Sequence, residues 1–155
     1  MKPSSKISLI AIALFSITSC TYKLIRYKTY VNHKVNFYKF KIPKNYIRSE
    51  FDNERESATI FKYTDSSYIT VSDDIADQAF PPDAVKKYGN DVTSQFLAHD
   101  TIIFDGYDQQ FGFWRIGKLK NIVINYGAKD KKKKALFDSL FSISSIRSKS
   151  VDQKN

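Results

Sequence analysis

TIIFDGYDQQFGFWRIGKLKNIVINY, residues 101–126, holds three apolar runs separated by short turn-like junctions. The runs are residues 101–104, 111–119 and 121–126, and the junctions are Asp105-Gly106 and Lys120-Asn121. Runs rich in Ile, Val, Phe and Trp are typical of strands. A parallel crossover needs a dozen or more residues, so these short junctions require antiparallel pairing. The stretch therefore predicts three neighbouring antiparallel strands.

Two regions nearer the N-terminus also predict strands. Residues 36–42 (NFYKFKI) alternate over most of their length, with Tyr38, Phe40 and Ile42 on one side, as in a half-buried strand. Residues 58–63 and 68–72 flank the turn-forming sequence TDSS and give the clearest hairpin in the chain. Between these regions, residues 44–57 are mostly polar and predict a loop with a helical turn.

Three segments predict helices. Residues 84–88 follow a plausible N-cap, Asp83, and precede Gly89, while residues 92–98 have room for a further turn or two. Residues 130–146 form the strongest candidate, because their apolar residues follow one helical stripe. That stripe contains Leu136, Phe137, Leu140, Phe141 and Ile143.

Four lysines, Lys131, Lys132, Lys133 and Lys134, occupy the first turn of that last helix. Cations at a helix N-terminus oppose the macrodipole, so we expect this end to be exposed. The run is a candidate basic patch. It is either a solvated helix end or a contact for anionic headgroups and lipopolysaccharide phosphate.

The first twenty residues, MKPSSKISLIAIALFSITSC, have the pattern of an export signal. Lys2 and Lys6 precede an apolar run over residues 7–17. As a helix this run covers about 16 Å, whereas a bilayer core is about 30 Å thick, so the segment is too short to span it. A charged start, a short apolar run and small residues are typical of a secretory signal peptide.

The end of this segment, Ile17-Thr18-Ser19-Cys20, resembles the lipobox of bacterial lipoproteins, with Ile17 where Leu is commonest. The resemblance implies that the Cys20 thiol receives a diacylglycerol and that cleavage leaves Cys20 as the first mature residue. Loss of Lys2 and Lys6 would lower the net charge from +9 to +7. An ordinary signal peptide cut elsewhere and an uncleaved anchor are the alternatives.

The predicted organisation has one folded domain, in keeping with 155 residues. Residues 1–19 are the lipoprotein signal peptide, residues 20–35 a lipidated tether or a first edge strand, residues 36–147 the domain, and residues 148–155 a flexible polar tail. Runs of strands with separate helices predict the α+β class: an antiparallel sheet of about five to six strands with the C-terminal helix on one face, a two-layer sandwich. This element order resembles small envelope lipoprotein domains and, distantly, the PsbP-like α/β sandwich.

Motifs for catalysis, metal binding and cofactor binding are absent from the sequence. It contains no G-x-S-x-G elbow and no glycine-rich phosphate loop, and its only imidazoles are His33 and His99. One Cys and two His cannot form a structural zinc site, and the acidic clusters do not match a calcium loop. We therefore predict no catalytic residues, no metal and no cofactor. The positive charge would suit nucleic acid, but an export signal argues against that partner.

The segment around the single Trp is the candidate interaction surface: Tyr107, Phe113, Trp114 and Arg115. If it is an ordinary strand, its aromatic residues fill the core, with Phe113 and Arg115 on one face and Trp114 on the other. If it is exposed, it offers the residue types that dominate binding interfaces. Both interpretations stay open at this level.

The sequence predicts a non-enzymatic binding or accessory module in the bacterial cell envelope, anchored in the outer membrane or another periplasm-facing membrane through lipidated Cys20. Its expected partner is a protein or an envelope component rather than nucleic acid. The alternative is a small envelope hydrolase that acts on glycans through a pair of carboxylates, which require a separation of about 5–10 Å.

Overall fold

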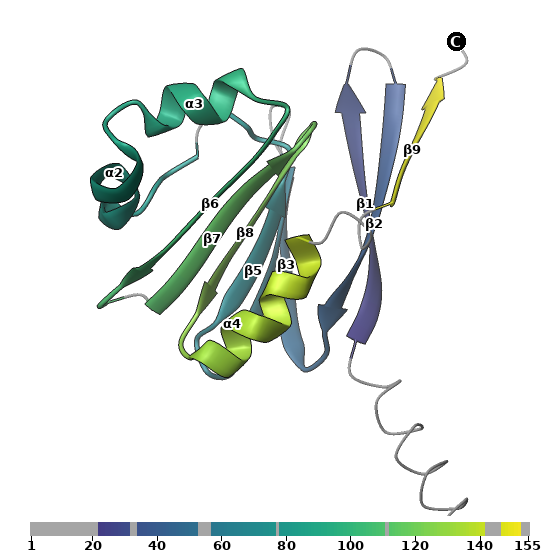
Figure 1. The fold of residues 1–155 in the computed structure, drawn as a ribbon. Coiled ribbons are helices and arrows are strands. Elements are labelled where there is room, and N and C mark those ends of the chain that lie inside the picture. Colours follow the sequence, from purple (N-terminus) through teal and green to yellow (C-terminus); the bar gives the residue numbers. More distant parts are fainter. Residues whose placement is uncertain are drawn as a thin grey trace, which may run out of the picture.

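A six-stranded antiparallel sheet forms the centre of the computed structural model, which describes residues 22–31, 34–52, 57–76, 78–110, 112–141 and 147–152. The strand order is β3-β4-β5-β8-β7-β6 (Figure 1). This arrangement confirms the predicted α+β class, the antiparallel sheet and the hairpin around residues 64–67. The strands are β3 (Tyr46–Asp52), β4 (Ser57–Tyr63), β5 (Tyr68–Ser72), β6 (Thr101–Asp108), β7 (Gly112–Leu119) and β8 (Ile122–Ala128).

A second antiparallel sheet of three strands lies against the first. It consists of β1 (Tyr22–Val31), β2 (Lys34–Pro43) and β9 (Arg147–Asp152), with β2 in the middle. The tether predicted for residues 20–35 is therefore a full strand over most of its length, in agreement with the edge-strand alternative. Ile25 and Tyr27 are buried at alternating positions, so this strand packs an apolar side. The tail predicted from residue 148 pairs with β2 over Arg147–Asp152 because backbone hydrogen bonding does not require apolar residues.

Strand β3 corrects a third prediction, the loop with a helical turn over residues 44–57. β3 is the edge of the main sheet and pairs along its length with β4, from Tyr46↔Tyr63 to Asp52↔Ser57. The ring of Tyr46 packs edge-on against Phe61, with 5.0 Å between centroids. Edge strands are often polar, and cross-strand packing here outweighs the weak local strand signal.

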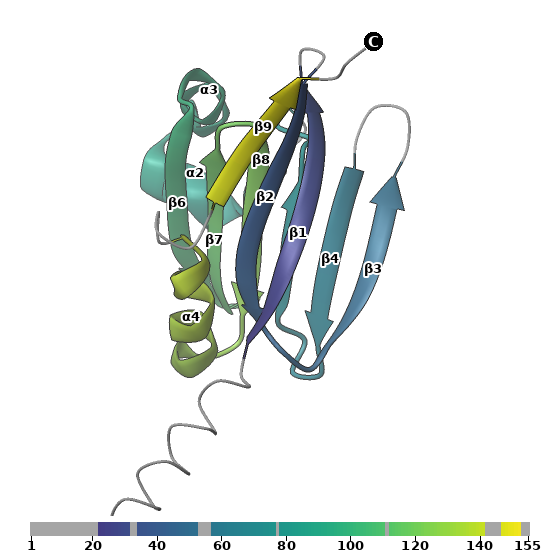
Figure 2. The same ribbon diagram turned by 90° about the vertical axis from the view of Figure 1, so that its right-hand side faces the viewer.

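Helices cover both faces of the main sheet. Helices α2 (Pro82–Tyr88) and α3 (Val92–Ala98) lie on one face, whereas α4 (Lys131–Asp138) and the small sheet lie on the other (Figures 1 and 2). Helix α2 begins at Pro82, one position before the predicted N-cap Asp83, and ends at Gly89 as predicted. Helix α4 is shorter than predicted and continues as a 3-10 turn, Ser139–Phe141, while residues 142–146 lie outside the described residues.

Two apolar clusters result from this layering. The first fills the space between the main sheet, the small sheet and α4, and it includes Tyr38, Phe40 and Ile42 as the alternation predicted. The second lies between the main sheet and α2–α3 and includes Phe96, Phe104 and Trp114. Each fully buried Phe or Ile side chain contributes about 1.5–3 kcal/mol by leaving water. The predicted two-layer sandwich thus has an additional helical layer.

Within the described part of the chain, no helix combines the length and apolar character needed to cross a bilayer.

Candidate binding surfaces

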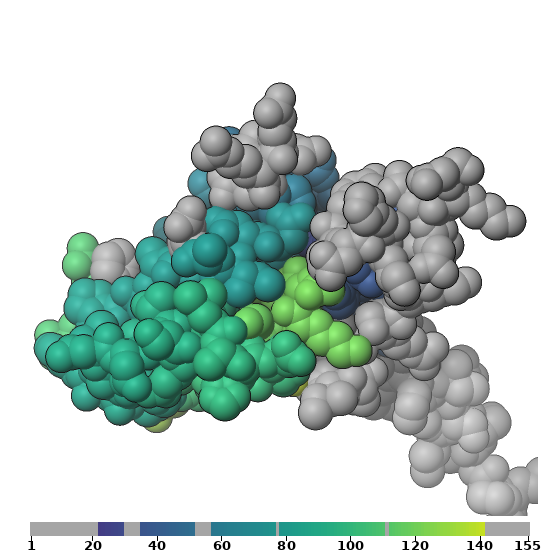
Figure 3. All heavy atoms as spheres, turned by 90° about the horizontal axis from the view of Figure 1, so that it is seen from above, coloured from purple at the N-terminus to yellow at the C-terminus, as the bar shows by residue number. Residues whose placement is uncertain are grey.

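Trp114 does not belong to an exposed surface. It is 3% exposed and lies in the second apolar cluster, on the side of β7 that faces α2 and α3. The possibility that Trp114 offers an exposed anchor is therefore wrong, and the alternative in which it fills the core is confirmed. Its large apolar area explains this placement, because burying it stabilises the helical layer. In Figure 3, which views the molecule from above, the teal and green atoms of α2 and α3 lie together on one side of the molecule.

Tyr107 and Phe113 form an aromatic pair next to the turn that connects β6 and β7. They are directly opposed in the register, and their ring centroids lie 4.9 Å apart. Tyr107 is 53% exposed. These two members of the predicted interaction surface thus lie together, on the opposite face of β7 from Trp114, with Tyr107 exposed and Phe113 partly buried against the first apolar cluster.

Arg115 shares the face of Phe113 but is committed to internal ion pairs. Its Nη2 lies 3.0 Å from Asp105 Oδ2 on β6, and its Nη1 lies 2.9 Å from Asp138 Oδ1 on α4. Lys87 Nζ is 2.8 Å from Asp105 Oδ1, and Lys134 Nζ is 2.6 Å from Asp138 Oδ2. Positive and negative groups therefore alternate across α2, β6, β7 and α4. This network holds four elements together and leaves Arg115 no freedom to act as a binding anchor.

The charges of this network shift the pKa values of two neighbours. Hydrogen bonds from Lys87 and then Arg115, opposed by partial burial, lower the pKa of the Asp105 carboxyl to about 2. Burial, together with a hydrogen bond to Asp138, raises the pKa of the Tyr126 phenol far above its usual value. Asp105 is therefore ionised and Tyr126 protonated at neutral pH, a state suited to structure rather than to proton transfer.

The Tyr88 hydroxyl closes the outer edge of β6 beside this network. It donates to the Asp105 carbonyl oxygen at 3.0 Å and accepts from the Asp105 backbone N–H at 3.1 Å. An edge strand otherwise leaves such groups open for pairing with another chain. The β6 edge is therefore covered by α2 at this point.

An open pocket of about 460 Å³ lies between α2 and the end of β6. It brings residues of α2 and of the end of β6 to a common concave surface, although the two elements are separate in sequence. The Asp108 Oδ1 accepts a hydrogen bond from the Gln110 backbone N–H at 2.8 Å, which fixes the turn after β6. The pocket is lined by Pro82, Asp83, Lys86, Tyr107, Asp108 and Gln109.

The predicted basic patch is divided in two. Lys131 and Lys132 are exposed. Lys133 lies 4.1 Å from the centroid of the Tyr63 ring and pairs with Asp65 at 3.1 Å, and Lys134 pairs with Asp138. Lys133 and Lys134 are therefore used within the fold, which corrects the prediction of a uniformly exposed run. The Asp130 side chain accepts from the Lys133 backbone N–H and so caps this helix despite its lysines.

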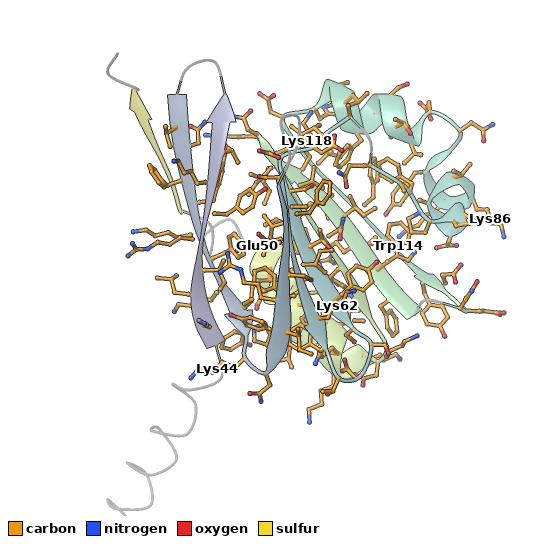
Figure 4. The ribbon with its side chains drawn as sticks, turned by 180° about the vertical axis from the view of Figure 1, so that it is seen from behind. Lys44, Glu50, Lys62, Lys86, Trp114 and Lys118 are labelled. Atoms are coloured by element: carbon orange, nitrogen blue, oxygen red, sulfur yellow. The ribbon has the colours of Figure 1, made fainter. Side chains whose placement is uncertain are left out.

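An apolar region that sequence reasoning missed lies on the half of the main sheet not covered by α2 and α3. Ile47 is 74% exposed, Phe51 is 51% exposed and Tyr68 is 41% exposed. Lys62 lies between Ile47 and Tyr68 in the register, and Figure 4 labels it. We call Ile47, Phe51 and Tyr68 the open sheet face. The sequence pattern that could have indicated this face is the alternation of Ile47, Ser49 and Phe51, in a stretch that was interpreted as a loop.

The remaining candidates give no further site among the described residues. His99 is exposed, and no group of three or more Cys, His, Asp or Glu side chains there could hold a metal ion. Ile17, Thr18, Ser19, Cys20 and His33 lie outside the described residues.

No protein family, curated protein or solved structure matches the chain.

Proposed function

We propose that the chain is a lipid-anchored protein of the bacterial cell envelope whose domain acts as a non-catalytic binding or accessory module. The observation that carries the proposal is the lipobox-like Ile17-Thr18-Ser19-Cys20, followed at once by folded structure, since β1 begins at Tyr22. Acyl chains contribute about 0.8 kcal/mol per buried CH₂, so two or three chains on Cys20 would hold the domain durably at a membrane.

The anchor is tested by metabolic labelling with a fatty-acid analogue. We expect Cys20→Ser to abolish labelling and to leave unprocessed precursor, whereas Thr21→Ser, a matched change one position later, keeps both labelling and processing. A Cys20→Ser protein that matures to the same size and still partitions into detergent would contradict the anchor.

The open sheet face supports the binding role. Exposed apolar side chains gathered on one surface are typical of contact sites for another protein. Among the large apolar residues that the structure describes, Ile47 is the most exposed. In-cell crosslinking followed by mass spectrometry tests this role. We expect one near-stoichiometric protein partner that is lost in Ile47→Lys and kept in Leu97→Lys, since Leu97 is an exposed apolar residue on α3. Equal recovery of the partner with both variants would show that the partner does not bind at the open sheet face.

The pocket beside α2 favours the second candidate, a small glycan hydrolase. It brings Asp83 and Asp108 to one concavity beside Lys86, and a pair of carboxylates is the usual equipment for glycoside hydrolysis. If the protein turns over envelope glycans, and this activity disappears in both Asp83→Asn and Asp108→Asn with unchanged folding, the enzyme would replace the binding module as the proposed function. Lack of turnover in the wild-type protein would remove this candidate.

A further inference from the structure

We infer that the outward side of the β1–β2 hairpin is a membrane-contact surface for anionic phospholipid headgroups, an inference that rests on the proposed lipid anchor. We call this surface the outer hairpin face and define it by Leu24, Arg26, Phe37, Lys39 and Lys41, all of which are exposed. In Figure 2 the strands β1, β2 and β9 form the layer nearest the viewer, in front of the main sheet.

The alternation of the two strands creates this face. Ile25, Phe40 and Ile42 point into the first apolar cluster, so their neighbours along each strand point outward. The antiparallel register then sets Leu24 opposite Lys41 and Arg26 opposite Lys39. On its other side β2 pairs with β9, and the backbone register sets Arg147 opposite Lys39.

Two like charges are directly opposed on this face. Arg26 and Lys39 are directly opposite each other, an arrangement that destabilises a sheet unless an anion compensates for it. Residues 20–49 contain eight Lys or Arg and no Asp or Glu, whereas residues 50–155 contain 15 basic and 16 acidic residues. Among the described residues, Arg26, Lys39 and Lys41 make no ion pair. The positive charge of the mature chain therefore resides in the segment next to the anchor.

The position of the anchor selects the occupant. Tyr22 follows Cys20 by two residues, which reach at most about 7 Å, less than the Debye length of about 8 Å at physiological ionic strength. The start of β1 is therefore held within the electrostatic reach of the membrane that holds the acyl chains, and the cations further along the two strands come within that reach when the hairpin lies flat on the membrane. Leu24 is 53% exposed and Phe37 is 37% exposed, and such apolar side chains among cations suit the headgroup boundary. With the hairpin flat on the membrane, the main sheet and its open sheet face point away from the lipid.

The experiment uses the full chain, purified from membranes in its acylated form and placed in phosphatidylcholine vesicles with or without phosphatidylglycerol. Because the chain has one Cys, which the acyl group occupies, an introduced Cys is the only thiol for a fluorescent label. Lys39→Cys reports on the outer hairpin face. Lys62→Cys, an exposed Lys on the other side of the molecule, is the matched control. Lipids carrying a headgroup quencher measure the proximity of each label to the membrane.

We expect strong quenching at position 39 in anionic vesicles, weak quenching there in neutral vesicles or high salt, and weak quenching at position 62 throughout. Replacing Arg26 and Lys41 by Gln should weaken the contact about fivefold for each cation removed. Equal quenching at both positions would overturn the inference, and so would quenching at position 39 that is the same with and without anionic lipid. A mass spectrum without acyl chains would contradict the proposed anchor instead. The same labels on protein that also carries Cys20→Ser, added to vesicles, would then decide whether the face binds headgroups by itself.

Discussion

Arg115 on β7 and Asp138 on α4 are joined by an ion pair of 2.9 Å between Nη1 and Oδ1. Their side chains are only 17% and 27% exposed, so the pair is shielded from water more than most surface pairs. The same guanidinium reaches Asp105 and lies 5.5 Å from the centroid of the Phe141 ring. Arg115 therefore attaches α4 and the 3-10 turn that follows it to β7 and β6, at one side of the main sheet.

Replacing Arg115 by Met should lower the free energy of unfolding by about 2 kcal/mol, because two carboxylates lose their shared partner in a partly buried place. Urea titration followed by the fluorescence of Trp114, the single Trp, measures this change. Lys131→Met is the matched control, since Lys131 is exposed, and it should change stability by less than about 0.5 kcal/mol. Equal losses in both variants would show that the Arg115 network contributes no specific stability.

Acid should remove the contribution of Asp105. Its pKa in the folded protein is about 2, below the value of about 3.9 expected when the chain is unfolded. The folded state therefore gains stability that is complete above about pH 5 and is lost progressively as the pH falls through about 4 toward 2. Partial exposure of Asp105 reduces the effect to about 1 kcal/mol. In urea titrations, the stability difference between wild type and Asp105→Asn should narrow over this range. A difference that stays constant from pH 6 to pH 2 would contradict this account.

Strands were predictable where apolar and polar side chains alternate strongly. They were missed where pairing with a neighbouring strand, rather than the local sequence, determines the secondary structure. The pattern Tyr38, Phe40, Ile42 identified β2 correctly, because three large apolar residues at a period of two have few other interpretations. In β3, Ile47 and Phe51 alternate as well, but they face outward, so the stretch lacked the apolar residues that mark a buried side. Its pairing with β4 depends on a neighbouring strand, which local reasoning does not include.

The candidate surface was predictable in composition but not in orientation. Alternation correctly separated Phe113 and Arg115 from Trp114. Which face would be covered depended on α2 and α3, and a single sequence does not state where a helix packs. Likewise, Lys133 follows the pattern of a solvated helix end, and only its contact with Tyr63 shows that it is used within the fold.

Two glycines on the same face of the sheet should respond differently to Ala. A Cβ at Gly106 would lie 2.5 Å from Cζ2 of buried Trp114 and 2.5 Å from Oδ2 of Asp83, and the indole ring has no room to move. A Cβ at Gly127 would meet Cε1 of Tyr68, whose ring is on the open sheet face and can turn toward solvent. We expect Gly106→Ala to cost about 2 kcal/mol and Gly127→Ala less than about 1 kcal/mol in urea unfolding. The reverse order would contradict this packing.

Among the side chains that the structure describes, Lys118 is the most buried basic one, with 7% exposure, and Figure 4 shows it close to α3. Its ammonium donates to the carbonyl oxygens of Leu97 at 2.9 Å and Phe96 at 3.3 Å. The last carbonyls of a helix lack partners within the helix, so this ammonium satisfies two groups that would otherwise be left without hydrogen bonds.

Lys118→Met keeps the apolar stem and removes the donor. It should therefore lower the free energy of unfolding by about 2 kcal/mol. It should also speed hydrogen exchange of the α3 amides more than those of α4, because only α3 loses its C-terminal partner. Lys86→Met on exposed α2 is the matched control, with an expected change within about 0.5 kcal/mol. Hydrogen exchange in α3 that is the same in Lys118→Met and Lys86→Met would show that the ammonium does not stabilise this helix end.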